Sequence, residues 1–319
     1  MKVLPLPGAL ALLALLGLGL SGCHRDDALR APNLIISRPG VHDGQLRMPR
    51  ALAFSPDGAR LYVLDRTHRV QVFDPDGRFL LAWETPPGDL GNPRSLDIAP
   101  DGTVILADTH NSQIVEYSPE GVLLRKFGHM GRRPGEFAAV TSVKRAPDGS
   151  LWTTEYGNYQ DRVQKLDAAG RPLLTYGVFG RGSGQINRPQ GLAIGPEGRV
   201  YVADAVNHRL LILDEEGRRI GGWGTPDGGD APGELRYPYD VAVDRQGRVY
   251  VAEFGNSRIS VFTAEGAFLT SWGRPGRAPG EFDHPWGVAL SPRGEVYVAD
   301  TMNYRIQRFD PLPQRLATR

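Results

Sequence analysis

The sequence contains a single cysteine in 319 residues, which excludes an intramolecular disulfide and a zinc site built from several cysteines. Acidic and basic residues are also nearly balanced, since the formal net charge is only +1. Removal of residues 1–22 would take away Lys2 and no acidic residue, which leaves a charge near zero. Such a chain has no overall electrostatic attraction for nucleic acid or an anionic membrane. We therefore expect no nucleic-acid partner.

Long apolar runs are scarce as well. The apolar segment Ala9–Leu20 follows a short basic start at Lys2 and is too short to span a bilayer as a stable helix. A short basic start followed by an apolar stretch of this size is typical of an export signal. Residues 1–22 are therefore predicted to be a signal peptide.

The only cysteine lies directly behind this segment, in Leu20-Ser21-Gly22-Cys23, which resembles the bacterial lipobox. An ordinary signal peptide, or a buried cysteine, are the alternatives. The resemblance implies that Cys23 is acylated and that residues 23–33 form a lipid-anchored linker, with several acyl chains giving stable attachment. His24 in place of an acid favours, by resemblance to Gram-negative lipoproteins, the outer membrane facing the periplasm. Contact with the membrane is expected through the lipid anchor only.

One pattern recurs six times: a run of β-favouring residues ending in an acid, a short loop, and an Arg or Gln that opens the next run. The acids are Asp65, Asp108, Glu155, Asp204, Glu253 and Asp300, spaced 43, 47, 49, 49 and 47 residues apart. The residues that open the next run are Arg69, Gln113, Arg162, Arg209, Arg258 and Arg305. A regular period of this length indicates a repeat architecture. We expect an acid present once per repeat to stabilise the repeat, by pairing with the Arg or accepting loop N–H groups, rather than to perform catalysis or bind calcium.

Glycine and proline, with 40 and 26 residues, mark turns within each repeat. Glycine accepts the positive φ that tight hairpin turns require. In the fifth repeat, the runs between turns predict strands at Tyr239–Val243, Arg248–Ala252, Arg258–Phe262 and Phe268–Trp272. Four short antiparallel strands repeated six times at a period near 47 residues match the blades of an all-β, six-bladed β-propeller.

The two ends of the repeat region complement one another. The sixth repeat stops after Phe309-Asp310 and lacks its last strand, whereas Leu34–Gly40 resembles Leu269–Gly276 of the fifth repeat. We predict that residues 34–37 supply the outer strand of the last blade. The propeller then covers residues 34–310, and residues 311–319 form a C-terminal tail.

Two segments closely resemble the NHL repeat: Asp204 to Leu210, with Asn207-His208-Arg209, and Asp300 to Ile306, with Asn303-Tyr304-Arg305. The openings Pro189-Gln190-Gly191 and Pro285-Trp286-Gly287 belong to the same pattern. The resemblance implies a six-bladed propeller of four-stranded blades. It implies no single activity, because NHL propellers include ligand-sensing domains of bacterial receptor kinases, RNA- and protein-binding domains of ubiquitin ligases, and a peptide-amidating lyase.

The lyase resemblance can be tested by position, because it implies zinc-binding histidines directly after the residue that opens each blade. Those positions hold Arg50, Arg94, Thr141, Gln190, Tyr239 and Trp286. None is histidine, so a zinc site of that type is not expected. His68, His110 and His208 lie in the loops after the acids and are expected to be solvated rather than metal ligands. The sequence assigns no catalytic residue, no metal and no cofactor.

Function in a repeat protein is expected where the repeats differ. By analogy with other propellers, the strand-opening positions lie near the central channel. Arg50 and Arg94 on one side, with Tyr239 and Trp286 on the other and Gln190 between them, could bind an anionic or sugar-like ligand. The alternative is that these side chains only fill the channel.

Two further departures lie in the second and third repeats. The loop Glu155–Arg162 of the third repeat is longer than most and carries Tyr156 and Tyr159, which are candidates for a partner-binding loop. Asp97 and Lys144 replace an alanine found in the other four repeats, and we expect them to form a buried pair that fixes packing.

The leading hypothesis is a non-catalytic binding or scaffolding propeller, exposed at the bacterial cell envelope and monomeric. It would bind an unknown protein or small ligand at the loop face or channel mouth. The alternative is a propeller enzyme, similar to the peptide-amidating lyase or to lactonase-like hydrolases, that uses a metal in the channel.

Overall fold

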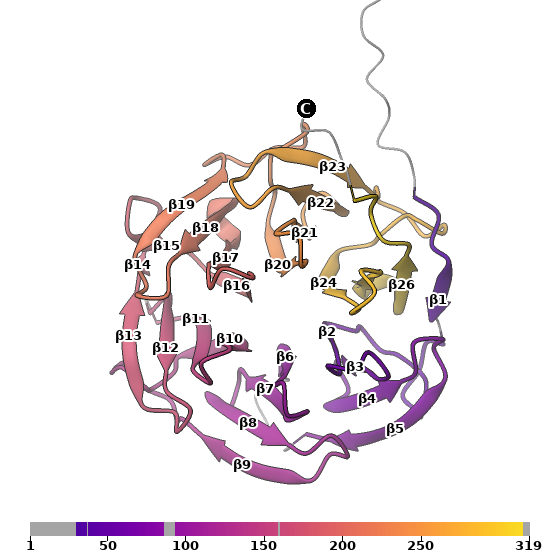
Figure 1. Cartoon of the computed structure of the whole chain (residues 1–319), viewed down its shortest axis with the longest axis horizontal. Helices are drawn as coiled ribbons and strands as arrows, with labels where there is room; N and C mark the ends of the chain where they lie inside the picture. Colours follow the sequence, from indigo (N-terminus) through magenta and orange to yellow (C-terminus); the bar gives the residue numbers. More distant parts are fainter. Residues whose placement is uncertain (1–29, 37, 86–92, 159, 315–319) are drawn as a thin grey trace, which may run out of the picture.

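The computed structural model describes residues 30–36, 38–85, 93–158 and 160–314. The predicted signal peptide, Cys23 and Tyr159 lie outside the described residues. These ranges form six four-stranded antiparallel sheets arranged in a ring, with one strand of each sheet near the centre (Figure 1). The predicted all-β, six-bladed propeller is confirmed. In the part of the chain that the structure describes, no helix has the length and apolar character needed to cross a membrane.

The strands of each blade follow one another from the centre of the ring outward. Blade 1 contains β2 (Ala51–Phe54), β3 (Leu61–Leu64), β4 (Arg69–Phe73) and β5 (Phe79–Glu84). Blade 2 contains β6 (Ser95–Ile98), β7 (Val104–Asp108), β8 (Gln113–Tyr117) and β9 (Leu123–Phe127). Blade 3 contains β10 (Ala139–Arg145), β11 (Leu151–Tyr156), β12 (Arg162–Leu166) and β13 (Pro172–Tyr176).

The second half of the ring repeats this order. Blade 4 contains β16 (Pro189–Ile194), β17 (Val200–Asp204), β18 (Arg209–Leu213) and β19 (Arg219–Gly224). Blade 5 contains β20 (Pro238–Val243), β21 (Val249–Glu253), β22 (Arg258–Phe262) and β23 (Phe268–Trp272), which differ from the predicted strands by at most one residue at each end. Blade 6 contains β24 (Pro285–Leu290), β25 (Val296–Asp300), β26 (Arg305–Phe309) and β1 (Leu34–Ile36). Two short parallel strands, β14 (Val178–Phe179) and β15 (Gln185–Ile186), and two 3-10 turns, η1 (Ala205–Asn207) and η2 (Thr301–Asn303), complete the described elements.

The ring closes between the two ends of the repeat region, as predicted. Strand β1 pairs antiparallel with β26, with Leu34 opposite Arg308 and Ile36 opposite Ile306. The contact extends beyond the strand, because Arg30 donates through Nη2 to the carbonyl oxygen of Asp310 at 2.6 Å. The loops that follow are also equivalent, since the bridge Pro39↔Leu46 matches Pro275↔Phe282.

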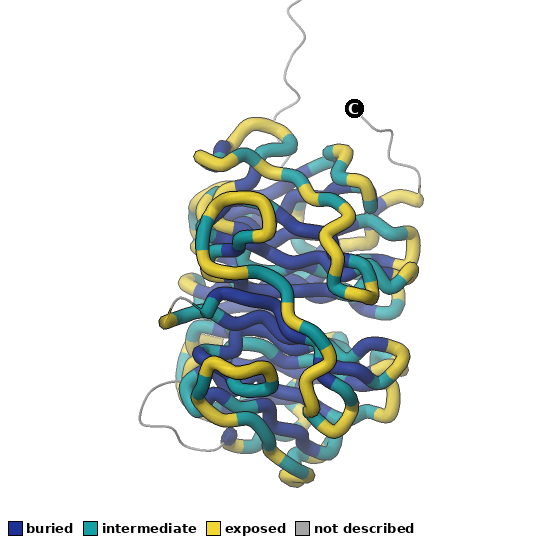
Figure 2. Tube along the Cα trace, turned by 90° about the vertical axis from the view of Figure 1, so that its left-hand side faces the viewer, coloured by how far each residue is buried: buried dark blue, intermediate teal, exposed yellow. Residues whose placement is uncertain are grey.

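Apolar side chains fill the spaces between neighbouring blades rather than the centre of the ring. The buried residues form six clusters, and each cluster joins two adjacent blades. Figure 2 shows the buried strands in the interior and the exposed residues mainly at loops. Because a blade buries each face only against its neighbours, the ring has to close before the first and last blades bury theirs.

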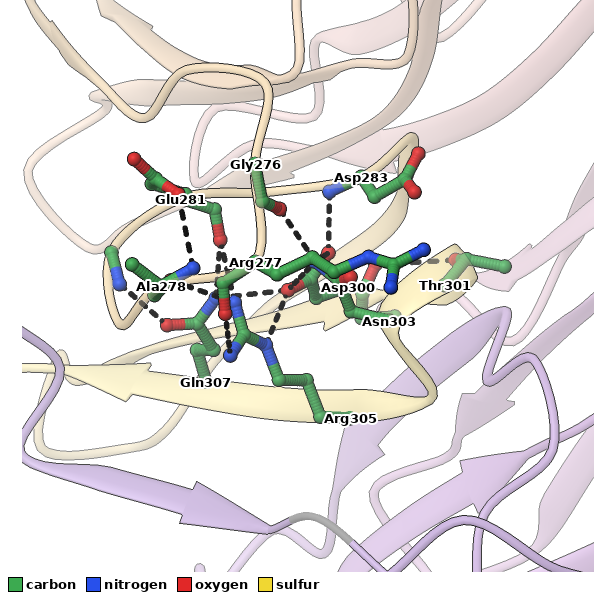
Figure 3. A network of polar contacts seen from close by, with 12 residues as sticks. Gly276, Arg277, Ala278, Glu281, Asp283, Asp300, Thr301, Asn303, Arg305 and Gln307 are labelled. Atoms are coloured by element: carbon green, nitrogen blue, oxygen red, sulfur yellow. Dashed lines mark hydrogen bonds and ion pairs between the residues drawn. The ribbon is translucent and has the colours of Figure 1, made fainter.

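The repeated acids stabilise the loops between blades. Asp300 is fully buried and accepts hydrogen bonds from the backbone N–H of Asp283 at 2.7 Å, from Nε of Arg305 at 2.6 Å and from Nε2 of Gln307 at 3.0 Å (Figure 3). Arg305 also donates to loop carbonyl oxygens, including that of Glu281 at 2.9 Å. Buried charges are tolerated when they are paired and hydrogen-bonded in this way.

The same pairing occurs in every blade. The acid-to-partner distances are 3.3 Å for Asp65–Arg69, 2.9 Å for Asp108–Gln113, 2.7 Å for Glu155–Arg162, 2.7 Å for Asp204–Arg209, 2.7 Å for Glu253–Arg258 and 2.6 Å for Asp300–Arg305. The predicted structural role of the acids is therefore observed.

Candidate channel-mouth site

The six residues that directly follow the blade-opening positions come together at one end of the central channel. The six are Arg50, Arg94, Thr141, Gln190, Tyr239 and Trp286. With neighbouring residues of the inner strands, among them Asp240, they line a narrow cavity of about 20 Å³. This is room for about one water molecule. A ligand larger than water would therefore rest at the mouth rather than inside this cavity.

Local strand irregularities turn several of these side chains toward the channel. The pairing register shifts between Val140 and Ser142, between Pro238 and Asp240, and between Pro285 and Gly287. A β-bulge of this kind re-aims the side chain at the extra residue. Thr141, Tyr239 and Trp286 occupy these bulged positions.

Two of the six residues are committed to local structure. Thr141 donates through its hydroxyl to the carbonyl oxygen of Pro189 at 2.8 Å, and its side chain is buried. Gln190 is 4% exposed, and its side-chain amide donates to the carbonyl oxygen of Arg188 at 3.4 Å. The Thr141 contact joins blades 3 and 4, whereas the Gln190 contact is local to blade 4. Four partly exposed residues remain at the channel mouth: Arg50, Arg94, Tyr239 and Trp286.

The two arginines lack acidic partners among the described residues. Neither Arg50 nor Arg94 forms an ion pair there, and the buried Nε of each has no hydrogen-bond partner. Burial and the positive charge of Arg94 lower the pKa of Arg50 to about 10. Two guanidinium groups are thus held close to one another without a counterion.

These cations lie against aromatic rings. The guanidinium carbons of Arg50 and Arg94 lie 5.0 and 5.8 Å from the ring centroid of Trp286. Arg94 also lies 5.5 Å from the ring of Tyr156, and Arg188 lies 4.9 Å from the same ring. Cation–π contacts of this kind are stabilising but leave the N–H donors of each guanidinium free.

Aromatic side chains form the other half of the channel mouth. Tyr239 stacks on Phe254 with ring centroids 4.3 Å apart, and it meets Trp286 edge-on at 4.9 Å. His284 lies 4.5 Å from Phe254 at the rim. We call the set Arg50, Arg94, Tyr156, Tyr239, Phe254 and Trp286 the channel-mouth site.

The structure brings together residues that the sequence analysis assigned to two different sites, and it adds one residue that was not predicted. Tyr156, predicted for a partner loop, is the last residue of β11 and contacts Arg94. Phe254 was not predicted. The signal for it lay in the position directly after the repeated acid, where blades 3 and 5 carry the aromatic residues Tyr156 and Phe254 and the other blades do not.

The loop histidines do not form a shared site. Burial, together with the charges of Arg94 and Arg50, lowers the pKa of His110, which favours the neutral imidazole. His208 instead accepts a hydrogen bond through Nδ1 from the backbone N–H of Tyr237 at 3.1 Å. Within the described ranges, no three His, Cys, Asp or Glu side chains are placed so that they could hold a metal ion together.

The predicted pair of Asp97 and Lys144 is present deeper in the channel. Nζ of Lys144 lies 3.2 Å from Oδ1 of Asp97, and the backbone N–H of Arg145 donates to Oδ2 at 2.8 Å. The pair joins blades 2 and 3. Asp240 of blade 5 adds a second carboxylate, which accepts a hydrogen bond from the backbone N–H of Val288 at 3.0 Å.

Sequence comparison supports the repeat assignment. The model of the NHL repeat matches residues 187–213, 235–262 and 282–309, which lie in blades 4, 5 and 6. NHL repeat-containing protein 3 of Homo sapiens is 27% identical over 170 residues, covering 50% of this chain and 49% of the human protein. The chain thus spans about half the length of this relative. Protein lin-41 of Caenorhabditis elegans is 40% identical over 89 residues, or 27% of this chain and 7% of that protein.

Solved structures show the same fold at low sequence identity. A streptogramin B lyase has a TM-score of 0.60 and 15% identity, with 86% of this chain and 96% of that chain covered. A catalytically inactive virginiamycin B lyase from Staphylococcus aureus, solved with quinupristin, has a TM-score of 0.58 and 15% identity, with 88% and 89% covered. With six four-stranded blades and repeats that match the family model, this chain is an NHL-repeat protein that folds as a six-bladed β-propeller.

Proposed function

We propose that this chain is a non-catalytic binding protein of the bacterial cell envelope, which takes a small ligand or a group of a protein partner at the channel-mouth site. The observation that carries the proposal is the unpaired state of Arg50 and Arg94 among the described residues. The arginines that recur in the repeats are paired with the repeated acids instead. Charged side chains that have no partner at a channel mouth contribute little to folding, and they can bind a ligand of opposite charge.

The site also fits a binding surface in its composition. Arginine and large aromatic residues are enriched at positions that dominate binding energy. The members of the channel-mouth site are partly exposed, so a ligand can reach them from solvent. They come from all blades except blade 4, so a closed ring is needed to assemble them.

Placement at the envelope rests on the sequence. The lipobox at Leu20–Cys23 supports export and acylation at Cys23, with the outer membrane and a periplasmic orientation favoured by His24. Metabolic labelling with a palmitate analogue tests this directly. Label on the wild-type chain and none on Cys23→Ser is expected, whereas equal labelling or a wholly cytoplasmic wild-type chain would refute the proposal of a lipoprotein.

Binding can be tested by site-specific photocrosslinking in intact cells. A photoreactive phenylalanine analogue in place of Tyr156 should yield a discrete adduct, because Tyr156 contacts Arg94 of the mouth. The matched control carries the analogue in place of Arg245, which lines a separate cavity at the opposite end of the channel. Equal adducts at both positions would count against a binding role for the mouth. The same conclusion would follow if Tyr156 gave no adduct and the protein bound no small molecule in solution.

A propeller enzyme is the second candidate, whether similar to the peptide-amidating lyase or to lactonase-like hydrolases. The solved lyases share the fold with this chain, and at their level of identity they support the fold alone. Metal analysis of the purified mature protein separates the two candidates. Stoichiometric zinc or calcium would favour an enzyme, and metal-free protein that still binds at the mouth would favour a binding protein.

A further inference from the structure

The geometry points to a small ligand that joins an oxyanion to a planar ring, with the oxyanion between Arg50 and Arg94 and the ring against Tyr239, Phe254 and Trp286. This inference rests on the proposed function and names the ligand class for the same site. The shared chemistry is a carboxylate or a phosphate on an aromatic or similarly flat group.

The oxyanion is inferred from the two arginines. Both guanidinium groups face Trp286, and the charge of one disfavours the charge of the other. Like charges that are half-buried and close together repel one another, and a bound anion would turn this repulsion into attraction. Guanidinium groups present a planar fork of N–H donors that matches the oxygens of carboxylates and phosphates.

The surrounding groups favour an anion over a cation. Nδ1 of His68 is buried without a hydrogen-bond partner among the described residues, and His110 experiences the fields of both arginines. The six residues of the channel-mouth site include no carboxylate. The nearest acid in the cavity beneath them is Asp240, whose charge is opposed by Lys144, and Asp97 is paired with the same lysine. A cationic ligand would therefore meet like charge at the entrance.

The planar ring is inferred from the opposite wall. Tyr239 and Phe254 stack parallel to each other, and Trp286 meets both edge-on. A fixed arrangement of partly exposed rings offers both faces and edges to a further flat group. Because the cavity between these residues measures only about 20 Å³, a ring would lie across the opening rather than inside the cavity.

Isothermal titration with matched probes tests the assignment. The probes are benzoate, phenyl phosphate, acetate, inorganic phosphate and the neutral benzyl alcohol. We expect benzoate or phenyl phosphate to bind at least roughly tenfold more tightly than benzyl alcohol, because only the anions engage the guanidinium forks. The same ring-bearing anion should bind several-fold more tightly than acetate or inorganic phosphate. Preference between benzoate and phenyl phosphate then identifies the oxyanion as carboxylate or phosphate.

Variants locate the site. R50Q, R94Q and the double variant should lose roughly tenfold or more in affinity for the anions, whereas R245Q at the opposite end should bind like the wild type. The charge-conserving R50K/R94K should recover only part of the loss, because lysine lacks the planar fork. W286A should lower the affinity for benzoate and phenyl phosphate to nearly that for acetate and inorganic phosphate. Thermal melts confirm that each variant is folded.

Chemical shifts of His110 provide an independent readout. A bound anion near the arginines should raise the pKa of His110 by offsetting their charge. Benzyl alcohol binding as tightly as the anions, or full binding by R50Q/R94Q, would overturn the inference. If benzyl alcohol competes with the anions for the mouth, the inferred ligand class is wrong but the proposed binding function stands. If no probe binds and Tyr156 gives no crosslink, the ligand class and the binding function are both refuted.

Discussion

Arg50 of blade 1 lies over the indole ring of Trp286 of blade 6, with its guanidinium carbon 5.0 Å from the ring centroid. The two residues are separated by nearly the whole repeat region and meet because β1 closes the ring at blade 6. The channel-mouth site therefore depends on the same event that completes the fold. This dependence, and the electrostatics of the channel, can be tested by substitution.

Loss of β1 should destabilise the whole propeller. Ile36 is 7% exposed and belongs to the apolar cluster between blades 6 and 1. Ile36→Ala should cost about 2–4 kcal/mol in the free energy of unfolding, because truncation of a buried aliphatic side chain leaves a cavity. Deletion of residues 30–40 should lower the melting temperature by many degrees. The control is Val41→Ala, since Val41 is 50% exposed. A melting temperature unchanged by the deletion would be incompatible with closure by β1.

Removal of a repeated acid should be much more costly than removal of a surface acid. Asp300→Asn leaves the buried guanidinium of Arg305 without its charge partner, for which we expect a loss of about 3–5 kcal/mol. Glu216→Gln removes only an exposed partner of Arg218 and should cost no more than about 1 kcal/mol. Urea unfolding of both variants checks the difference. Similar losses in both would show that the network in Figure 3 contributes little.

Neutralising a mouth arginine should raise the pKa of His110. Burial and the charges of Arg94 and Arg50 lower this pKa, so R94Q removes one of the opposing charges and stabilises the imidazolium. Proton NMR titration of the His110 ring measures the change. R245Q should leave the titration unaltered. A pKa that falls or stays fixed in R94Q would mean that Arg94 does not act on His110.

Asp240 should make stability depend on pH. Burial raises the pKa of Asp240 from 3.8 to about 6 in the folded protein, against the opposing effect of Lys144. A raised pKa means that the protonated form is favoured by folding, so this contribution is complete below about pH 4 and is lost as pH rises through about 6.

Asn in place of Asp240 stays neutral and can still accept the hydrogen bond from Val288. Relative to the wild type, Asp240→Asn should gain about 1–2 kcal/mol between about pH 4 and pH 7, since partial exposure of Asp240 to solvent reduces the full effect. Denaturant unfolding at several pH values checks the gain. Asp76→Asn, at an exposed position, is the control. A difference between Asp240→Asn and wild type that is constant with pH would contradict the assignment.

Much of the architecture was predictable because it repeats. The acid at Asp204 and the arginine at Arg209 recur in equivalent form in other repeats, so their pairing could be expected from the repeat pattern alone. The pair Asp97–Lys144 could be predicted from two departures at one repeat position. The third member of that charged group, Asp240, lies at a different position of the inner strand and gave no comparable signal.

Local sequence patterns were sufficient to specify the number of blades, their strands, the closing strand and the position at which each blade opens toward the channel. Hydrophobic alternation, glycine turns and acid–arginine pairs are local, and repetition makes each of them readable several times. The closed ring was needed to establish which opening residues remain free: Thr141 and Gln190 bond to backbone, whereas Arg50 and Arg94 keep unused donors beside Trp286. This could not be predicted locally, because the hydrogen-bond partners of a residue at the channel come from neighbouring blades, and their approach is fixed only when the ring closes.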